Sequence, residues 1–250
     1  MNRPIRDFYD HNASTYDRDL FTTDDVVSAR RCHRLLRDGI PCNDHRDPGS
    51  LTPRILEIGC GTGLYTQHLA RRHPQLIAMD LSGAMLQRVR DKMSDSPVRF
   101  LQGDATALPF AAHSFEHVLA FSCLHHVPDT PAVFREVFRI LQPGGRFLLM
   151  EPNPLNPVNC LLGVVRSVER GMLHAFPGRF RREARRAGFH VQDCWSGSFF
   201  PAWPAWLSGW YQKLEPVLEE MRGIRNLAIF HYYHFVSPQD AQTFRKSVRK

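Results

Sequence analysis

The clearest chemistry of this sequence lies in a short segment that joins a hydrophobic run to several glycines. Residues 55–58 read Ile-Leu-Glu-Ile, and Gly59, Gly61 and Gly63 follow at alternate positions. Glycines directly after a strand let the backbone turn tightly into a helix and let a ligand lie on that turn. The carboxylate of Glu57 would repel a pyrophosphate but would attract an ammonium or sulfonium group. The segment therefore predicts a site for a cationic ligand.

Two further acids occupy matching positions along the chain. Asp80 ends a hydrophobic run at 75–79, and Asp104 follows a third run at 98–101. Each acid alone could cap a helix or a turn. The carboxyl ends of parallel strands meet at one edge of a sheet, so we expect both acids to lie beside the glycine turn. A carboxylate can accept two hydrogen bonds from a diol, which suits a ribose ring.

Strands and helices alternate from residue 54 onward, which favours a parallel sheet covered on both faces. The pattern predicts strands at 55–58, 75–79, 98–101, 115–121, 146–150, 189–195 and 227–236. It predicts helices at 64–72, after Ser82, through Val133 to Ile140, at 159–173 and at 179–187. A helix capped by Thr23 and Asp24 is expected nearer the start of the chain.

The motifs, in this order, resemble those of the class I S-adenosylmethionine (SAM)-dependent methyltransferases, close to the branch that acts on small molecules and lipid quinones. The resemblance covers about residues 50–152. It implies an enzyme with an α/β fold: a Rossmann-like doubly wound sheet of seven strands, the last antiparallel. We expect one domain over 1–250, with a helical N-terminal lid at 1–50, a SAM-binding core at 51–152 and the rest of the sheet at 153–250.

The resemblance also implies the cofactor contacts. Tyr16 would cover the methionine part of SAM, Asp80 would bind the ribose, and Asp104 would accept from the adenine amino group. The full set that it implies is Tyr16, Glu57, Gly59, Cys60, Gly61, Gly63, Asp80, Leu81, Met85, Gly103, Asp104, Ala105, Phe121 and Ser122.

Candidate catalytic residues follow the fourth predicted strand. His125 and His126 stand at the expected mouth of the site, and imidazole is a suitable base near neutral pH. The alternative is that both rings only pack where the next helix begins. Glu151, at the end of the fifth strand, could face the methyl acceptor. We expect no metal.

The acceptor must be inferred from the variable C-terminal part. Residues 199–210 contain Trp203, Trp206 and Trp210 among prolines, an aromatic-rich insert that suits a lipid-like acceptor or peripheral contact with a membrane. The net charge of +7 and the basic helix near Arg181 could add attraction to anionic lipid. The insert could instead pack on the sheet or pair two subunits, so the chain is expected to be a monomer or a homodimer.

Three other functions compete with a small-molecule methyltransferase. Positive charge favours RNA or other nucleic acid as substrate, but residues 121–124 lack the Asn/Asp-Pro-Pro-aromatic motif of enzymes that methylate bases. A nicotinamide oxidoreductase would place a third glycine at Leu64. A non-catalytic SAM-binding protein remains open. The chain has no signal-like N-terminus and no long apolar run, which favours the cytoplasm, and its six cysteines are expected to be reduced thiols.

Overall fold

The computed structural model describes residues 3–19, 25–36, 40, 54–199, 208–221 and 223–239. The helices are α1 (Arg3–Asn12), α2 (Tyr16–Asp19), α3 (Asp25–Leu36), α4 (Thr66–Ala70), α5 (Gly83–Lys92), α6 (Thr130–Ile140), α7 (Pro157–Val165), α8 (Pro177–Ala187) and α9 (Ser208–Glu220). Short 3₁₀ helices are η1 (Leu124–His126), η2 (Ser167–His174) and η4 (Ile224–Leu227). The strands are β1 (Ile55–Ile58), β2 (Ile77–Asp80), β3 (Arg99–Gln102), β4 (Phe115–Phe121), β5 (Leu141–Pro152), β6 (His190–Gly197) and β7 (Phe230–Val236).

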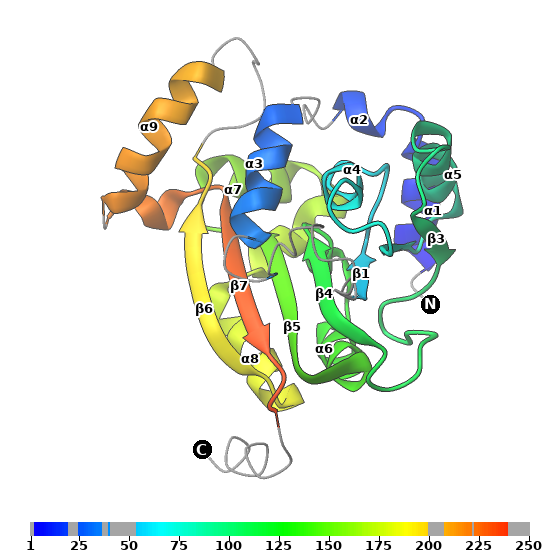
Figure 1. Cartoon of the computed structure of the whole chain (residues 1–250). Helices are drawn as coiled ribbons and strands as arrows, with labels where there is room; N and C mark the ends of the chain where they lie inside the picture. Colours follow the sequence, from blue (N-terminus) through cyan, green and yellow to red (C-terminus); the bar gives the residue numbers. More distant parts are fainter. Residues whose placement is uncertain are drawn as a thin grey trace.

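The seven strands form one sheet in the order β3-β2-β1-β4-β5-β7-β6 (Figure 1). Strands β1 to β5 pair in parallel, whereas β7 runs antiparallel between β5 and β6. The order reverses between β1 and β4, and ligands of doubly wound sheets bind at such a reversal, beyond the carboxyl ends of the strands. The expected seven-stranded sheet with an antiparallel last strand is confirmed.

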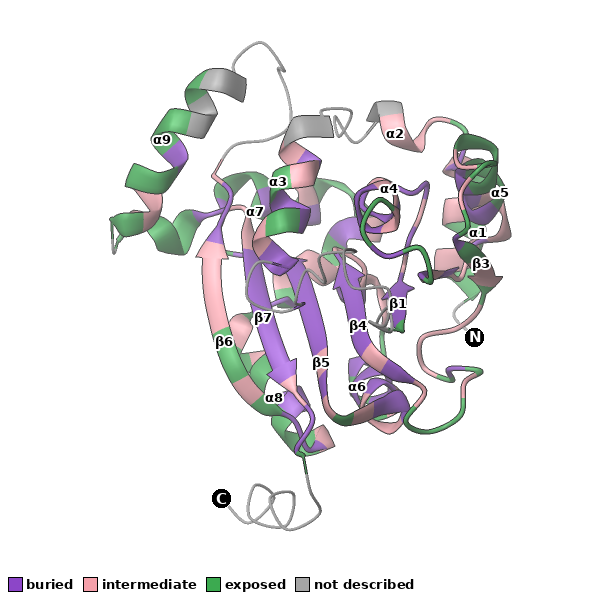
Figure 2. Cartoon of the chain, in the orientation of Figure 1, coloured by how far each residue is buried: buried purple, intermediate pink, exposed green. Residues whose placement is uncertain are grey.

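The central strands are buried on both faces, which explains their nearly continuous hydrophobic runs. In β4, Val118 and Ala120 point into a core shared with α6 and α8, while Leu119 and Phe121 point into a second core shared with α3, α4 and α5. Successive side chains of a strand alternate between faces, so one hydrophobic run supplies both cores. Figure 2 shows β4, β5 and β7 buried along most of their length.

Several boundaries differ from the sequence-based expectation. Strand β5 begins at Leu141 rather than at residue 146, because Leu141 already pairs with Phe115 of β4. The pairing of β4 with β5 is then interrupted around Gly144 (φ +79°) and resumes at Arg146. The helix expected at 159–173 is two elements, α7 and η2, which meet at Arg166. Residues 224–227 form η4, and β7 starts only at Phe230. Thr23, Asp24 and most of the aromatic insert, residues 200–207, lie outside the described residues.

Candidate functional site

The turn after β1 has the backbone geometry that only glycine adopts easily. Gly59, Gly61 and Gly63 have φ values of +72°, +53° and +90°. A Cβ on Gly59 would lie 2.5 Å from the Cβ of Cys123, and a Cβ on Gly63 would lie 2.4 Å from Val89. These two glycines are therefore required for packing against the end of β4 and against α5.

Gly61 differs, because a Cβ there would meet nothing within 4 Å. The turn thus presents an open stretch of backbone beside Asp80. One oxygen of Asp80 accepts from the Gly61 amide at 2.8 Å, and the other accepts from the Ser82 amide at 2.9 Å. Each oxygen keeps a second lone pair, so the fixed carboxylate can still accept from a ligand diol.

Two buried polar atoms near this turn are left without a partner among the described residues. One is Oε2 of Glu57, and the other is the hydroxyl of Ser122, a residue with φ +50° at the end of β4. Burial raises the pKa of Glu57 to about 8, and the nearby charge of Asp80 adds to the effect. Thr66 is close enough to the Glu57 carboxyl to offset part of this rise in pKa, but Oε2 makes no hydrogen bond to a described residue. A buried carboxyl oxygen of this kind suits a ligand that carries positive charge, as the cationic amino-acid part of SAM does. The residues present therefore fit this cofactor.

The N-terminal helices are attached to the same turn by two aspartates. Asp10 of α1 accepts from the Ser82 hydroxyl at 2.5 Å and from the Ala84 amide at 3.2 Å, at the start of α5. Asp17 of α2 binds both the Thr62 hydroxyl and the Lys92 ammonium. Between these contacts Tyr16 stands edge-on to Tyr9, with ring centroids 5.7 Å apart. Tyr16 is thus held beside the turn, and its contact with the cofactor stays a prediction.

The other predicted cofactor residues differ in their burial and in their contacts. Asp104 accepts from the amide and the hydroxyl of Thr106 at 2.9 and 2.7 Å. Gly103 packs on Met79, because a Cβ there would lie 2.6 Å from its sulfur. Phe121 is buried and stacks on Tyr65 at 4.3 Å. Cys60 and Met85 are also buried, whereas Leu81, Gly103, Asp104 and Ala105 are partly exposed.

A buried network of acids and histidines follows β4. Glu151, at the end of β5, accepts from the amides of Cys123 and Leu124 at 3.1 and 2.8 Å. Its second oxygen accepts from the amide of His125 at 3.2 Å and from Nδ1 of the same residue at 2.7 Å. One carboxylate thus caps η1 and orients the ring of His125.

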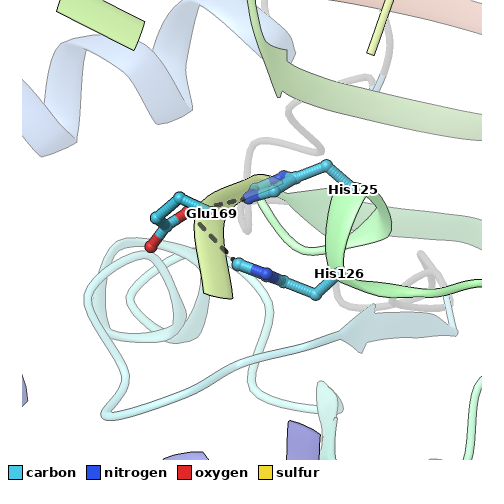
Figure 3. A group of neighbouring side chains, drawn as sticks. All are labelled: His125, His126 and Glu169. Carbon is cyan, nitrogen blue, oxygen red and sulfur yellow. Dashed lines mark hydrogen bonds and ion pairs between the residues drawn. The ribbon is translucent and has the colours of Figure 1, made fainter. Parts of the chain in front are cut away.

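Glu169 of η2 lies to one side of the two adjacent histidine rings and interacts with both (Figure 3). Its Oε2 is 3.4 Å from Nε2 of His125 and 3.8 Å from Nε2 of His126. The other ring nitrogen of His126, Nδ1, donates to the Val168 carbonyl at 3.1 Å. Neutral imidazole has one donor and one acceptor, so Nε2 of His126 is an acceptor, and it receives the Tyr9 hydroxyl at 2.7 Å.

The two histidines carry different charges at neutral pH. Burial alone would lower the pKa of His125, but the charges and hydrogen bonds of Glu151 and Glu169 outweigh it and raise that pKa to about 9. Burial, reinforced by the charge on His125, holds the pKa of His126 well below its usual value. His125 is therefore a fixed cation, and His126 is a neutral proton acceptor.

The same residue types occur in metal sites, and the ligand-type atoms of His125, His126 and Glu169 lie within 4.8 Å of one another. Here these atoms already bond to one another and to Tyr9. These contacts describe a hydrogen-bond network of protein side chains.

Sequence reasoning named His125, His126 and Glu151 but missed the roles of four other residues. Tyr9, Asp10 and Asp17 lie in the N-terminal segment, whose sequence does not show what these side chains bind. Glu169 lies outside every motif, and only the path of the chain after α7 brings it to the histidines.

Comparison with known proteins agrees with this geometry. Residues 56–149 match the family described as "Methyltransferase domain". The chain is 38% identical over 127 residues to the ubiquinone/menaquinone biosynthesis C-methyltransferase UbiE of Vibrio cholerae, covering 48% of this chain and 47% of that protein. It is 38% identical over 100 residues to the 2-phytyl-1,4-naphtoquinone methyltransferase of Thermosynechococcus vestitus, covering 38% and 44%. The chain thus spans about half the length of these curated relatives.

A solved structure covers more of the molecule. A SAM-dependent methyltransferase from Thermotoga maritima superposes with a TM-score of 0.67 at 19% identity, over 94% of this chain and all of that one. This likeness concerns the fold, and it extends beyond the residues that match the family. Residues 56–149 thus match a methyltransferase domain, and the similarity in fold extends over nearly the whole chain.

Proposed function

We propose that this class I methyltransferase domain transfers a methyl group from SAM to an O, N or C atom of a small, quinone-like or lipid-like metabolite and releases S-adenosylhomocysteine. One observation supports the proposal above all: the glycine turn and the acid–histidine network share Cys123. Its side chain packs on Gly59 and donates to the Ile58 carbonyl at 3.3 Å, while its amide binds Glu151. A methyl donor on the turn would therefore lie beside the network.

SAM supplies a sulfonium-bound methyl group that is already activated for transfer. The chain then has to hold that group, orient the acceptor and take up a proton where the acceptor loses one. Asp80 and the Gly61 backbone would hold the nucleoside, and Glu57 would face the positive charge of the amino-acid part. Tyr16 would cover the methionine chain.

We propose His126 as the group that receives the acceptor proton. Its Nε2 is an acceptor, and the Tyr9 hydroxyl now bonded to it marks where an acceptor O–H or N–H would donate. Glu151 and His125 would act as positioning residues, because they hold η1 in place. Burial, together with the charge of His125, keeps His126 neutral, so its Nε2 can accept a hydrogen bond from the acceptor.

The two named relatives act in ubiquinone/menaquinone biosynthesis and on a phytyl naphthoquinone. This similarity supports a quinone-like acceptor. We also propose a single domain over 1–250, a cytoplasmic location with peripheral membrane contact, and a monomer or homodimer. No helix among the described residues is both long and apolar enough to span a bilayer.

Calorimetric titration with SAM, followed by labelled-methyl transfer to reduced quinones, phenols, amines and a total RNA sample, tests the proposal. Heat with SAM and labelled reduced quinone are expected. Absence of any heat would overturn the cofactor assignment, and label in RNA alone would overturn the acceptor class. Binding without transfer to any of them would indicate a non-catalytic SAM-binding protein.

A further inference from the structure

Apolar side chains are exposed in a highly uneven way in this molecule. Among the described residues, ten of the twelve exposed large hydrophobic side chains lie within residues 155–165 and 210–227. These two short segments contain α7, α9 and η4. Scattered exposed hydrophobic residues are normal, but such a concentration marks an interaction surface. We call it the α7/α9 surface.

Helix α9 exposes its apolar face and buries part of its charged face, the reverse of a usual surface helix. Trp210, Leu214, Val217 and Met221 follow the i, i+4, i+7, i+11 spacing of one helical face, and all four are exposed; Trp210 is 68% exposed. The opposite face carries Glu215, which is only 9% exposed.

The acids of α9 hold the helix to the protein. Glu215 accepts from the Phe199 amide at 2.9 Å and lies 3.7 Å from the Arg34 guanidinium of α3. Glu219 binds the same Arg34. The charged face is therefore engaged by the protein and the apolar face is turned outward, so solvent is not the natural partner of that face.

Helix α7 has the same inverted arrangement. Asn159 is buried and its amide donates to the carbonyls of Asn153 and Ile229 at 3.0 and 2.7 Å. Gly163 is buried against Leu173 of η2. Val158, Leu161 and Val165, spaced i, i+3, i+7, are exposed on the other side.

The two helices are joined by η4. The side-chain amide of Asn156, which caps α7, donates to the Leu227 carbonyl of η4 at 2.8 Å. Helix α9 ends at Glu220, shortly before η4 begins at Ile224. Both helices lie at the end of the sheet where β1, β4 and β6 terminate (Figure 1). The exposed apolar residues thus belong to one end of the molecule, the end that also holds the glycine turn.

The charges around this surface indicate which partner covers it. The exposed charged side chains described in α7, η2, α9, η4 and their junctions are Arg166, Arg170, Lys213 and Arg225, with Glu220 as the single acid. A second copy that docked symmetrically would place this basic rim against itself. An anionic lipid surface would instead attract the rim while it accepts the apolar residues.

We propose that the α7/α9 surface docks on an anionic membrane, with Trp210, Leu161 and their apolar neighbours inserted among the lipids. Glu169 lies on η2, directly after α7, so docking brings the acid–histidine network next to the bilayer. That the membrane delivers a lipid-like acceptor rests on the proposed function. The docking specifies the peripheral membrane contact proposed above, but it does not depend on methyl transfer.

The test uses the full chain with vesicles of equal parts phosphatidylcholine and phosphatidylglycerol, and with phosphatidylcholine alone. Co-sedimentation should detect binding to the anionic vesicles, and salt should weaken it. Leu161→Gln with Val164→Gln, and separately Leu214→Gln with Val217→Gln, should each lower the partition coefficient more than about tenfold. Thermal unfolding and SAM titration of each variant show that the fold is intact.

Matched charge changes locate the contact. Arg166→Gln with Arg170→Gln should weaken binding to anionic vesicles about tenfold, at about 1 kcal/mol for each residue near the surface. Arg182→Gln with Arg186→Gln makes the same charge change on exposed residues of α8 and should leave binding unchanged.

Three results would overturn the proposal: no vesicle binding by the wild type, loss of binding only in the α8 variant, or a solution dimer that the Leu161 and Val164 replacements dissociate. If vesicles bind as expected but SAM gives no heat, the docking surface stands and the proposed function fails.

Discussion

The proposed cofactor edge and the proposed acceptor side of this molecule are built in different ways. At the cofactor edge, Gly61, Asp80 and Ser82 lie within a short stretch of chain, and their geometry follows from two neighbouring strands and one turn. On the proposed acceptor side, Tyr9 and Glu169 reach His126 from two segments that are distant from it and from each other in the sequence. A local motif fixes the first site, and only the complete fold assembles the second.

The difference has a functional consequence. The cofactor edge offers backbone amides and one carboxylate, a set that suits the same nucleoside in every member of a family. The proposed acceptor side depends on Glu169 of η2, which lies outside the residues that match the family. We therefore expect changes at the two regions to separate cofactor affinity from turnover.

The largest expected effect is at the cofactor edge. Asp80→Asn replaces one oxygen that accepts a backbone amide and removes the charge available to a diol. Loss of charge-assisted hydrogen bonds should weaken SAM binding by about 3 kcal/mol, a hundredfold or more, in calorimetric titration. Asp91→Asn, an exposed acid on α5, is the control and should bind SAM normally. Equal affinity of the two variants would contradict the assigned role of Asp80.

The second prediction concerns the fixed charge of His125. Its pKa is raised from 6.5 to about 9 in the folded chain, so the ion pair stabilises the fold fully below about pH 6.5 and loses that effect as the pH rises through 9. His125→Asn keeps a donor for Glu151 without the charge. The variant should be less stable than the wild type at pH 6 by up to about 3 kcal/mol, and the gap should close above pH 9.

Urea unfolding across this pH range measures the gap. Glu57, whose pKa is raised to about 8, titrates in the same window in both proteins, so the difference between them isolates His125. His113→Asn serves as the control, since that ring bonds only the Leu141 carbonyl in the described structure and Asn tolerates its φ of 57°. A gap that stays constant with pH would show that His125 is neutral.

The residues in these two predictions also show which parts of the fold and of the site could be predicted from the sequence. The alternation of strands and helices predicted the sheet, and Gly59, Asp80 and Ser82 took the places expected of them, because short-range chemistry determines each one. The hydrogen bonds of Glu151 to η1 were not predictable from the sequence, because Cys123 and Leu124, whose amides donate to it, follow β4 and are distant from Glu151 along the chain. The position of Glu169 and the exposure of the apolar faces of α7 and α9 were also not predictable. Both depend on which side of each helix packs against the rest of the protein, and the sequence alone does not determine that.

The third prediction addresses turnover. His126→Asn keeps a donor toward the Val168 carbonyl but removes the acceptor that now binds Tyr9. For an acceptor that loses a proton, kcat should fall about 30-fold, near 2 kcal/mol, while SAM affinity stays unchanged. Loss of affinity and of kcat by the same factor would indicate that His126 only supports the cofactor edge.

Tyr9→Phe refines that prediction. If the hydroxyl only occupies the place of the acceptor, the variant should keep most of its kcat, and the acceptor KM should change instead. A fall in kcat as large as that of His126→Asn would show that Tyr9 takes part in proton transfer, and the pH profile would then report both groups.

The smallest expected effect tests the buried acid under the glycine turn. Burial raises the pKa of Glu57 to about 8, so most of the population holds a proton at pH 7. A bound cation should favour the carboxylate, and SAM binding at pH 7 should release a fraction of one proton per site. Calorimetry in buffers of different ionisation enthalpy measures this release, and the slope should disappear in Glu57→Gln, which has no proton to lose. If the slope persists in that variant, the proton comes from another group, and the attraction between Glu57 and the cofactor would have to be abandoned.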